Sequence, residues 1–138
     1  MSVPRQTPRM RTSRQRSGDD AEGVVAARLA AGGWTILARQ LRLGRDELDI
    51  VAVDPGPPPA LVILEVRYRA SRAFGLPEET FDGRKRARVA RAAGRLVGDG
   101  RAGLRLPRLP LRIDLAVVEP PALPGGPPRV RHHRSVLG

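Results

Sequence analysis

The chain lacks cysteine and has few aromatic side chains, which make up 3% of its 138 residues. The absence of cysteine excludes a disulfide framework, thiolate zinc sites and a cysteine nucleophile. No apolar run approaches the roughly 18 residues that a membrane-spanning helix needs. The arginine-rich N-terminal segment is not followed by an apolar stretch, which argues against a secretory signal. We therefore expect a soluble, cytoplasmic protein.

Lysine is also nearly absent: 24 of the 25 basic residues are arginine, and with 14 acidic residues the net charge is +11. Such an excess is typical of proteins that bind nucleic acids, although a GC-rich genome also favours arginine. Residues 1–16 carry five arginines, residues 120–138 carry three, and neither segment has an acid, so residues 17–119 carry only +3. We expect a disordered basic arm at 1–17, a folded domain at 18–119, and a proline-rich linker with a basic segment at 120–138.

Hydrophobic residues still make up 41% of the chain, enough for one aliphatic core in a single domain. The apolar patterns predict helices at 19–31 and 82–97, strands at 34–43, 47–53, 61–68 and 112–118, and a short edge strand at 130–136. This order indicates an α/β domain with a mixed sheet. Because strand 61–68 is apolar on both faces, we expect helices to pack on the sheet.

The second predicted helix carries a basic stripe, at the spacing of one helical face, opposite an apolar face. We expect this stripe to contact the phosphates of a nucleic acid. Its members are Arg84, Arg88, Arg91 and Arg95. Lys85, the only lysine of the chain, lies instead with the apolar residues of the inward face.

Three acidic residues, Glu47, Asp49 and Glu65, lie within apolar strands, where carboxylates are unfavourable unless they are paired or bind metal. A hairpin closed by residues 54 and 60 would place Asp49 opposite Glu65 and Glu47 opposite Arg67, with Cβ atoms roughly 5 Å apart. Two such carboxylates repel each other, and a hard divalent cation would turn the repulsion into a binding site. The alternative is that each acid pairs with an arginine.

A fourth acid, Glu22, shares the face of the first predicted helix that carries Val25, Ala26 and Leu29. We therefore expect its side chain to point toward the sheet. It would lie there as a further acid of the site or as the partner of an arginine. Two other kinds of site lack support: adjacent His132 and His133 would point to opposite faces of a strand, and no serine has a paired base.

The string Glu47-Leu48-Asp49-Ile50, followed by Leu64-Glu65-Val66-Arg67, resembles the E-(I/L)-D … (V/L)-E-V-K pattern of the YraN-like family. These small bacterial proteins are predicted endonucleases of the restriction-endonuclease-like PD-(D/E)xK superfamily. The resemblance covers most of residues 18–118. It takes in Ala21-Glu22, Gly33-Trp34 with Ile36-Leu37-Ala38-Arg39, Arg69, the segment Phe74-Gly75-Leu76-Pro77-Glu78-Glu79, and Lys85.

The resemblance implies a three-layer fold, with a central mixed sheet flanked by helices, in a nuclease-like domain at 18–119. It implies that Asp49 and Glu65 bind Mg²⁺ or Mn²⁺, that Glu22 adds an acidic contact, and that DNA phosphodiesters are the substrate. Arg67 occupies the position of the motif lysine. An arginine can hold a phosphate but cannot readily accept a proton.

Lys85 could take over the role of the missing lysine if it points toward the carboxylates; otherwise it forms an ordinary surface contact. Three functions therefore remain open. The chain is a metal-dependent endonuclease, a nucleic-acid-binding module in which Arg67 impairs catalysis, or a basic structural component of a ribonucleoprotein.

Overall fold

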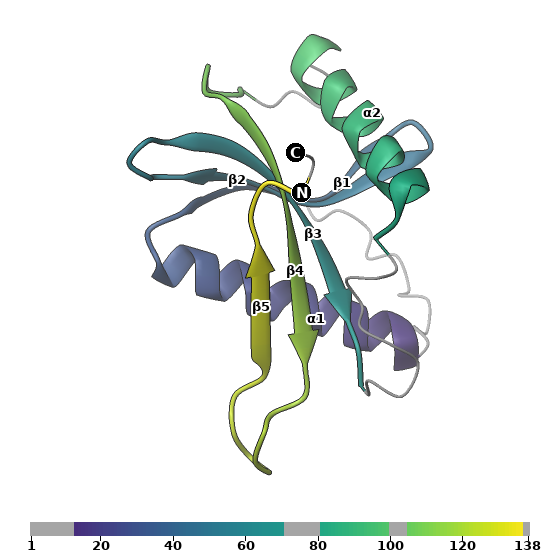
Figure 1. Cartoon of the computed structure of the whole chain (residues 1–138), viewed down its shortest axis with the longest axis vertical. Coiled ribbons are helices and arrows are strands. Elements are labelled where there is room, and N and C mark those ends of the chain that lie inside the picture. Colours follow the sequence, from purple (N-terminus) through teal and green to yellow (C-terminus); the bar gives the residue numbers. More distant parts are fainter. Residues whose placement is uncertain (1–12, 71–80, 100–104, 137–138) are drawn as a thin grey trace, which may run out of the picture.

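The computed structural model describes residues 13–70, 81–99 and 105–136, which form a five-stranded sheet with a helix on each face (Figure 1). The helices are α1 (Ser13–Ala31) and α2 (Gly83–Asp99). The strands are β1 (Thr35–Leu43), β2 (Asp46–Asp54), β3 (Ala60–Tyr68), β4 (Leu111–Glu119) and β5 (Arg129–His133). Neither of these helices is long and apolar enough to span a membrane. The predicted α/β architecture is confirmed, including the edge strand near the C-terminus.

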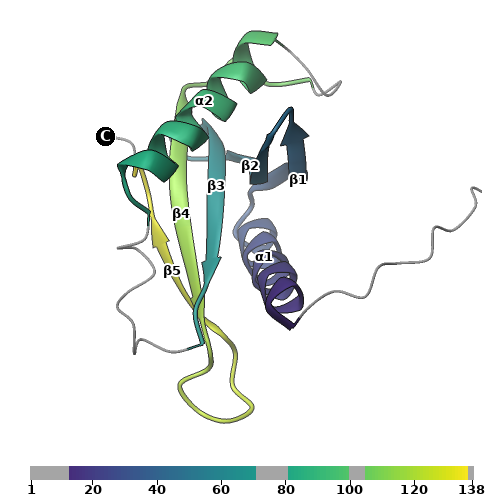
Figure 2. The same ribbon diagram turned by 90° about the vertical axis from the view of Figure 1, so that its right-hand side faces the viewer.

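The sheet is mixed, and the strands lie side by side in the order in which they occur in the chain. β3 and β4 are parallel, whereas the other neighbours are antiparallel. Parallel neighbours need a crossover connection, and α2 lies in that connection. The sheet therefore separates α1 from α2 (Figure 2), which confirms the predicted three layers.

Each face of the sheet has its own aliphatic core. Leu61 and Ile63 of β3 belong to the core with Leu96 of α2, whereas Val62 and Leu64 belong to the core with α1. The continuous apolar run of β3 is thus explained by burial on both faces. The apolar face predicted for α2 is also buried.

The β2–β3 hairpin has the predicted register from Asp54 and Ala60 to Ile50 and Leu64. The ladder ends there, so the predicted pairs Asp49–Glu65 and Glu47–Arg67 are not backbone partners. The reason is local: the Asp49 carboxylate accepts a hydrogen bond from the Val66 backbone N–H at 2.8 Å, in place of a carbonyl of β2.

The first helix differs from the prediction at its start. α1 begins at Ser13 rather than at Asp19, so residues 13–17 are helical and do not belong to a disordered arm. Arginine and glutamine favour helix here, and each added residue closes one more hydrogen bond. Residues 1–12 and the motif segment 74–79 lie outside the described residues.

Candidate active site

The candidate site begins where β2 and β3 part. Beyond Ile50, the side chain of Asp49 replaces the main chain of β2 as the partner of β3, through its bond to the Val66 N–H. The β1–β2 ladder is also interrupted here, since it contains no pair between Gln40 and Asp49. Gln40 has a left-handed backbone, with φ of 49°. Asp49 thus lies at the point where the backbone pairing of β2 is interrupted on both sides.

Glu65 is buried beside Asp49, with 7% of its surface exposed. Burial first, and then the neighbouring Asp49 carboxylate, raise the pKa of Glu65 from 4.5 to about 8. Its Oε1 atom is buried and has no hydrogen-bond partner among the described residues. The side chains of Asp49 and Glu65 thus meet as the sequence predicts, although their backbones are not paired.

A pocket of about 270 Å³ lies over Glu65 and Arg67, between the sheet and α2. The Nε atom of Arg67 is buried and, like Glu65 Oε1, has no hydrogen-bond partner in the described part of the chain. These are the only two unpaired buried side-chain polar atoms found there. One is an acceptor, the other is a donor, and both belong to residues that line the same pocket.

Lys85 and Arg88 of α2 line this pocket together with Arg45 and Glu47 from the start of β2. Burial, and then the charge of Arg67, lower the pKa of Lys85 below its usual value. The only lysine of the chain therefore lies on the wall that faces Glu65, on the side where the sequence places it.

Glu22 is buried on α1, as expected, and its Oε1 accepts a hydrogen bond from Arg39 Nε at 3.0 Å. Burial raises the pKa of Glu22, and the nearby Asp49 adds to the effect, against the Arg39 bond. Glu22 is thus close enough to Asp49 for the negative charge of Asp49 to raise the pKa of Glu22. Its carboxylate is paired with an arginine, which was one of the two predicted alternatives.

Of these acids, Asp49 and Glu65 fit a hard divalent cation. Carboxylate oxygens are the ligands that Mg²⁺ prefers, and one or two of them suffice when water and a substrate phosphate complete the octahedron. No cluster of three or more acidic, histidine or cysteine side chains that could hold a metal occurs within the described ranges. The free Oε1 of Glu65 is the observation that makes the pair suitable.

Comparison with known proteins gives the family. The model described as "Uncharacterised protein family UPF0102" matches residues 21–118. A UPF0102 protein of Moorella thermoacetica is 43% identical over 95 residues, which cover 68% of this chain and 77% of that protein. One of Frankia alni is 39% identical over 122 residues, which cover 87% and 92%. One of Sorangium cellulosum is 45% identical over 84 residues, which cover 61% of this chain and 56% of that protein. The chain belongs to the UPF0102 family.

This membership confirms the YraN-like family predicted from the motifs, while the nuclease superfamily remains a prediction. The UPF0102 match begins at Ala21 and ends at Val118. It therefore spans the carboxylate pair, the pocket and α2, and it leaves out the C-terminal strand β5. The candidate active site lies within the part of the chain that the family shares.

The predicted basic stripe lies on the exposed surface of α2. Arg88 lines the pocket, so the stripe runs up to its rim. Arg91 and Arg95 approach the buried carboxylate of Asp46, at 3.9 and 3.7 Å, and are partly engaged with it. In this UPF0102 protein Arg84 and Arg88 are thus the arginines of the stripe that are not engaged with Asp46.

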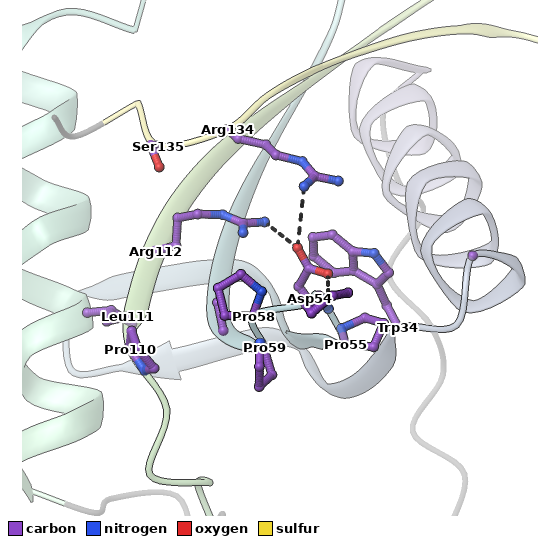
Figure 3. Close-up of a pocket in the computed structure, with 14 residues that line it drawn as sticks. Trp34, Asp54, Pro55, Pro58, Pro59, Pro110, Leu111, Arg112, Arg134 and Ser135 are labelled. Atoms are coloured by element: carbon purple, nitrogen blue, oxygen red, sulfur yellow. Dashed lines mark hydrogen bonds and ion pairs between the residues drawn. The ribbon is translucent and has the colours of Figure 1, made fainter.

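A further buried acid that the sequence patterns did not single out is Asp114 of β4, which is 0% exposed. It accepts two hydrogen bonds from Arg112 at 2.9 Å each, one from the Ser135 N–H at 3.0 Å, and lies 2.8 Å from His132 Nε2. Arg112 also bonds Asp54 at 2.9 Å (Figure 3). The acid inside the apolar run of β4, two residues after Arg112, was the available signal, but His132 and Ser135 come from a distant segment.

Proposed function

We propose that this protein is a Mg²⁺- or Mn²⁺-dependent endonuclease of the PD-(D/E)xK type that hydrolyses DNA phosphodiesters. The single observation that carries the proposal is the pair of unpaired atoms, Glu65 Oε1 and Arg67 Nε, on residues of one pocket. A cation at the carboxylate, together with an anionic acceptor at the guanidinium, would satisfy both atoms. A phosphodiester bound together with a divalent cation meets both conditions.

Each residue then has a defined role. Asp49 and Glu65 would hold the cation, which when bound lowers the pKa of water and neutralises charge on the phosphate. Arg67 holds a phosphate oxygen but cannot exchange a proton. Lys85, whose pKa burial and Arg67 lower, is the cationic group of the pocket that can exchange one. Glu22, whose pKa is raised by burial and further by the charge of Asp49, would add a further acidic group on the α1 side.

The rest of the surface near the pocket favours a polyanion as substrate. The stripe on α2 reaches the rim through Arg88, and the whole chain carries a net charge of +11. Arginines that line the path of a strand bind phosphates without regard to base sequence. We therefore expect the stripe to hold the DNA and the pocket to hold the scissile phosphate.

The test is cleavage of labelled duplex, single-stranded and branched DNA with Mg²⁺ or Mn²⁺, and with EDTA as the blank. Wild type is expected to cleave at least one of these substrates, and Asp49→Asn and Glu65→Gln are expected to lose about 100-fold or more. Glu47→Gln is the matched control, because Glu47 is an exposed acid on the wall of the same pocket. Equal loss in the control would overturn the assignment of the two acids.

The second candidate is a nucleic-acid-binding module without cleavage, and the presence of Arg67 favours it. It predicts that wild type binds DNA but cleaves none of the substrates, and that Arg67→Lys gains cleavage. Wild type that neither binds nor cleaves DNA would rule out both functions. Binding of RNA alone would instead favour the ribonucleoprotein hypothesis.

A further inference from the structure

A second and larger pocket, of about 570 Å³, lies at the end of the β2–β3 hairpin. It is formed by the end of α1, Trp34, the turn from Asp54 to Ala60, the start of β4 and Arg134 with Ser135 (Figure 3). It shares no lining residue with the pocket over Glu65. Ala60 and Glu65 are separated by five residues of β3, or roughly 16 Å.

The two pockets also lie on opposite faces of the sheet. Ile113 of β4 belongs to the core under α2, and side chains alternate along a strand, so Arg112 and Asp114 face α1. Trp34 packs against the core under α1. Anything bound in this pocket is therefore separate from the reaction proposed at Asp49 and Glu65.

Most of the charged groups around the pocket already have hydrogen-bond partners within the protein. The Asp54 carboxylate accepts hydrogen bonds from the Gly56 N–H and from Arg112, both at 2.9 Å. Arg112 is held on its other side by Asp114. Arg134 differs, because its nearest approach to Asp54 is 3.7 Å and its side chain is 62% exposed. Its guanidinium is therefore the group that can turn to an anion from solution.

The uncharged walls are flat and apolar. Trp34 is the only tryptophan of the chain and is half-buried, and the prolines of the 55–59 turn and Pro110 form a wall with no backbone donors. The guanidinium carbons of Arg112 and Arg134 lie 5.7 and 6.0 Å from the centre of the Trp34 ring. The His132 ring also lies 5.7 Å from the Trp34 ring, so a planar ring that enters the pocket packs against the remaining exposed part of Trp34 and the prolines, beside Arg134.

We propose that this pocket binds a nucleoside phosphate, with the base against Trp34 and the prolines and the phosphate on Arg134. Its volume is within the range of small-molecule sites, roughly 300–1,000 Å³. Bases stack well on aromatic rings, and arginine is the side chain best suited to phosphate. The nucleoside phosphate is either free in solution or the terminal nucleotide of a strand.

The test uses Trp34 as the only tryptophan fluorophore of the full chain. Wild type is titrated with a nucleoside monophosphate, with the matching nucleoside, with inorganic phosphate, and with a short 5′-phosphorylated oligonucleotide. The monophosphate is expected to change the fluorescence saturably, and the nucleoside to bind about tenfold more weakly because the contact to Arg134 is lost. Tighter binding of the oligonucleotide than of the monophosphate would identify a strand end as the source.

Arg134→Ala is the decisive variant, and Arg129→Ala is its matched control. Arg129 is also an exposed arginine of the C-terminal segment, but it bonds the Pro120 carbonyl and does not line the pocket. Arg134→Ala is expected to weaken the monophosphate about tenfold, whereas Arg129→Ala leaves it unchanged. Equal affinity in the two variants, or no saturable signal in wild type, would overturn the site. Asp49→Asn is expected to leave the signal intact, which separates this inference from the proposed nuclease.

Discussion

At the scale of single residues, the buried carboxylates of Asp114 and Glu65 differ in how their oxygens are hydrogen-bonded. Asp114 has four polar contacts, whereas the Oε1 atom of Glu65 has none among the described residues. An unpaired buried polar group costs about 1–3 kcal/mol, and a charged one costs more. Asp114 shows that this fold can provide hydrogen-bond partners for a buried carboxylate. We propose that a ligand of the pocket supplies the partner that Glu65 Oε1 lacks.

Lys85 gives the first prediction at this scale. If Lys85 exchanges a proton in the cleavage reaction, Lys85→Ala should lower the rate about 100-fold or more and change its pH profile. Arg67→Lys in the Lys85→Ala background should restore part of the rate, because a titratable ammonium then lies in the same pocket. Rates measured from pH 6 to 10 at saturating metal test this expectation.

The control for Lys85 is Arg86→Ala. Arg86 is its neighbour on α2, but its guanidinium bonds the Phe81 carbonyl and does not line the pocket. An unchanged rate and pH profile in Lys85→Ala would show that the lysine has only a surface role. If Lys85→Ala lost DNA affinity as well as cleavage rate, the result would indicate a general electrostatic effect of the lysine instead.

Asp114 gives a prediction about stability and pH. Burial alone would raise the pKa of Asp114, but the bonds from His132 and Arg112 outweigh it and lower the pKa from 3.8 to about 2. A lowered folded-state pKa stabilises the protein above the unfolded value, and this contribution is lost as the pH falls through the folded value. We expect about 2 kcal/mol to be lost between pH 5 and pH 2.

Urea unfolding of wild type and Asp114→Asn over this pH range measures the effect. The variant should be less stable by about 3 kcal/mol at pH 7, because Arg112 and His132 lose the charge of Asp114, and the difference should shrink toward pH 2. Asp20→Asn, an exposed acid on α1, serves as the control and should differ little from wild type. A difference that stays constant with pH would contradict the role of Asp114.

At the scale of elements, the sequence predicted the features that depend on residues close together in the chain. The β2–β3 register follows from a proline-rich turn and two apolar strands, so the closure at Asp54 and Ala60 could be predicted. The end of the ladder could not, because it depends on the Asp49 side chain competing for the Val66 N–H. Two partners of Asp114, His132 and Ser135, likewise come from a segment distant in the chain, and composition carries no signal for them.

The α2 stripe gives the prediction at this scale. The double variant Arg84→Ala/Arg88→Ala removes two exposed guanidiniums. The slope of log K for DNA binding against log salt concentration should therefore become shallower by about 1–2. The unfolding free energy should change by less than about 0.5 kcal/mol. Arg28→Ala/Arg129→Ala removes the same charge from exposed positions outside α2 and should leave the slope nearly unchanged. Equal slopes in the two double variants would exclude the stripe as the DNA contact.

At the scale of the whole molecule, the charge and the chemistry lie in different parts of the chain. Eight of the eleven net positive charges belong to residues 1–16 and 120–138, whereas the carboxylate pair lies in the nearly balanced segment between them. The UPF0102 match covers that balanced segment, from Ala21 to Val118. Affinity for a polyanion and the capacity to act on it can therefore be separated by deletion.

The last prediction uses this separation. Deletion of residues 1–12 removes Arg5, Arg9 and Arg11, three charges that lie before the first described helix. In the nuclease hypothesis, DNA affinity at low salt should fall by about tenfold and the slope against salt by about 2, while the rate at saturating protein stays unchanged. The thermal midpoint should also stay unchanged. In the ribonucleoprotein hypothesis the basic tails carry the binding, so the same deletion should lower the RNA affinity strongly as well. Binding isotherms from 50 to 300 mM salt therefore decide whether the folded domain or its basic extension holds the nucleic acid.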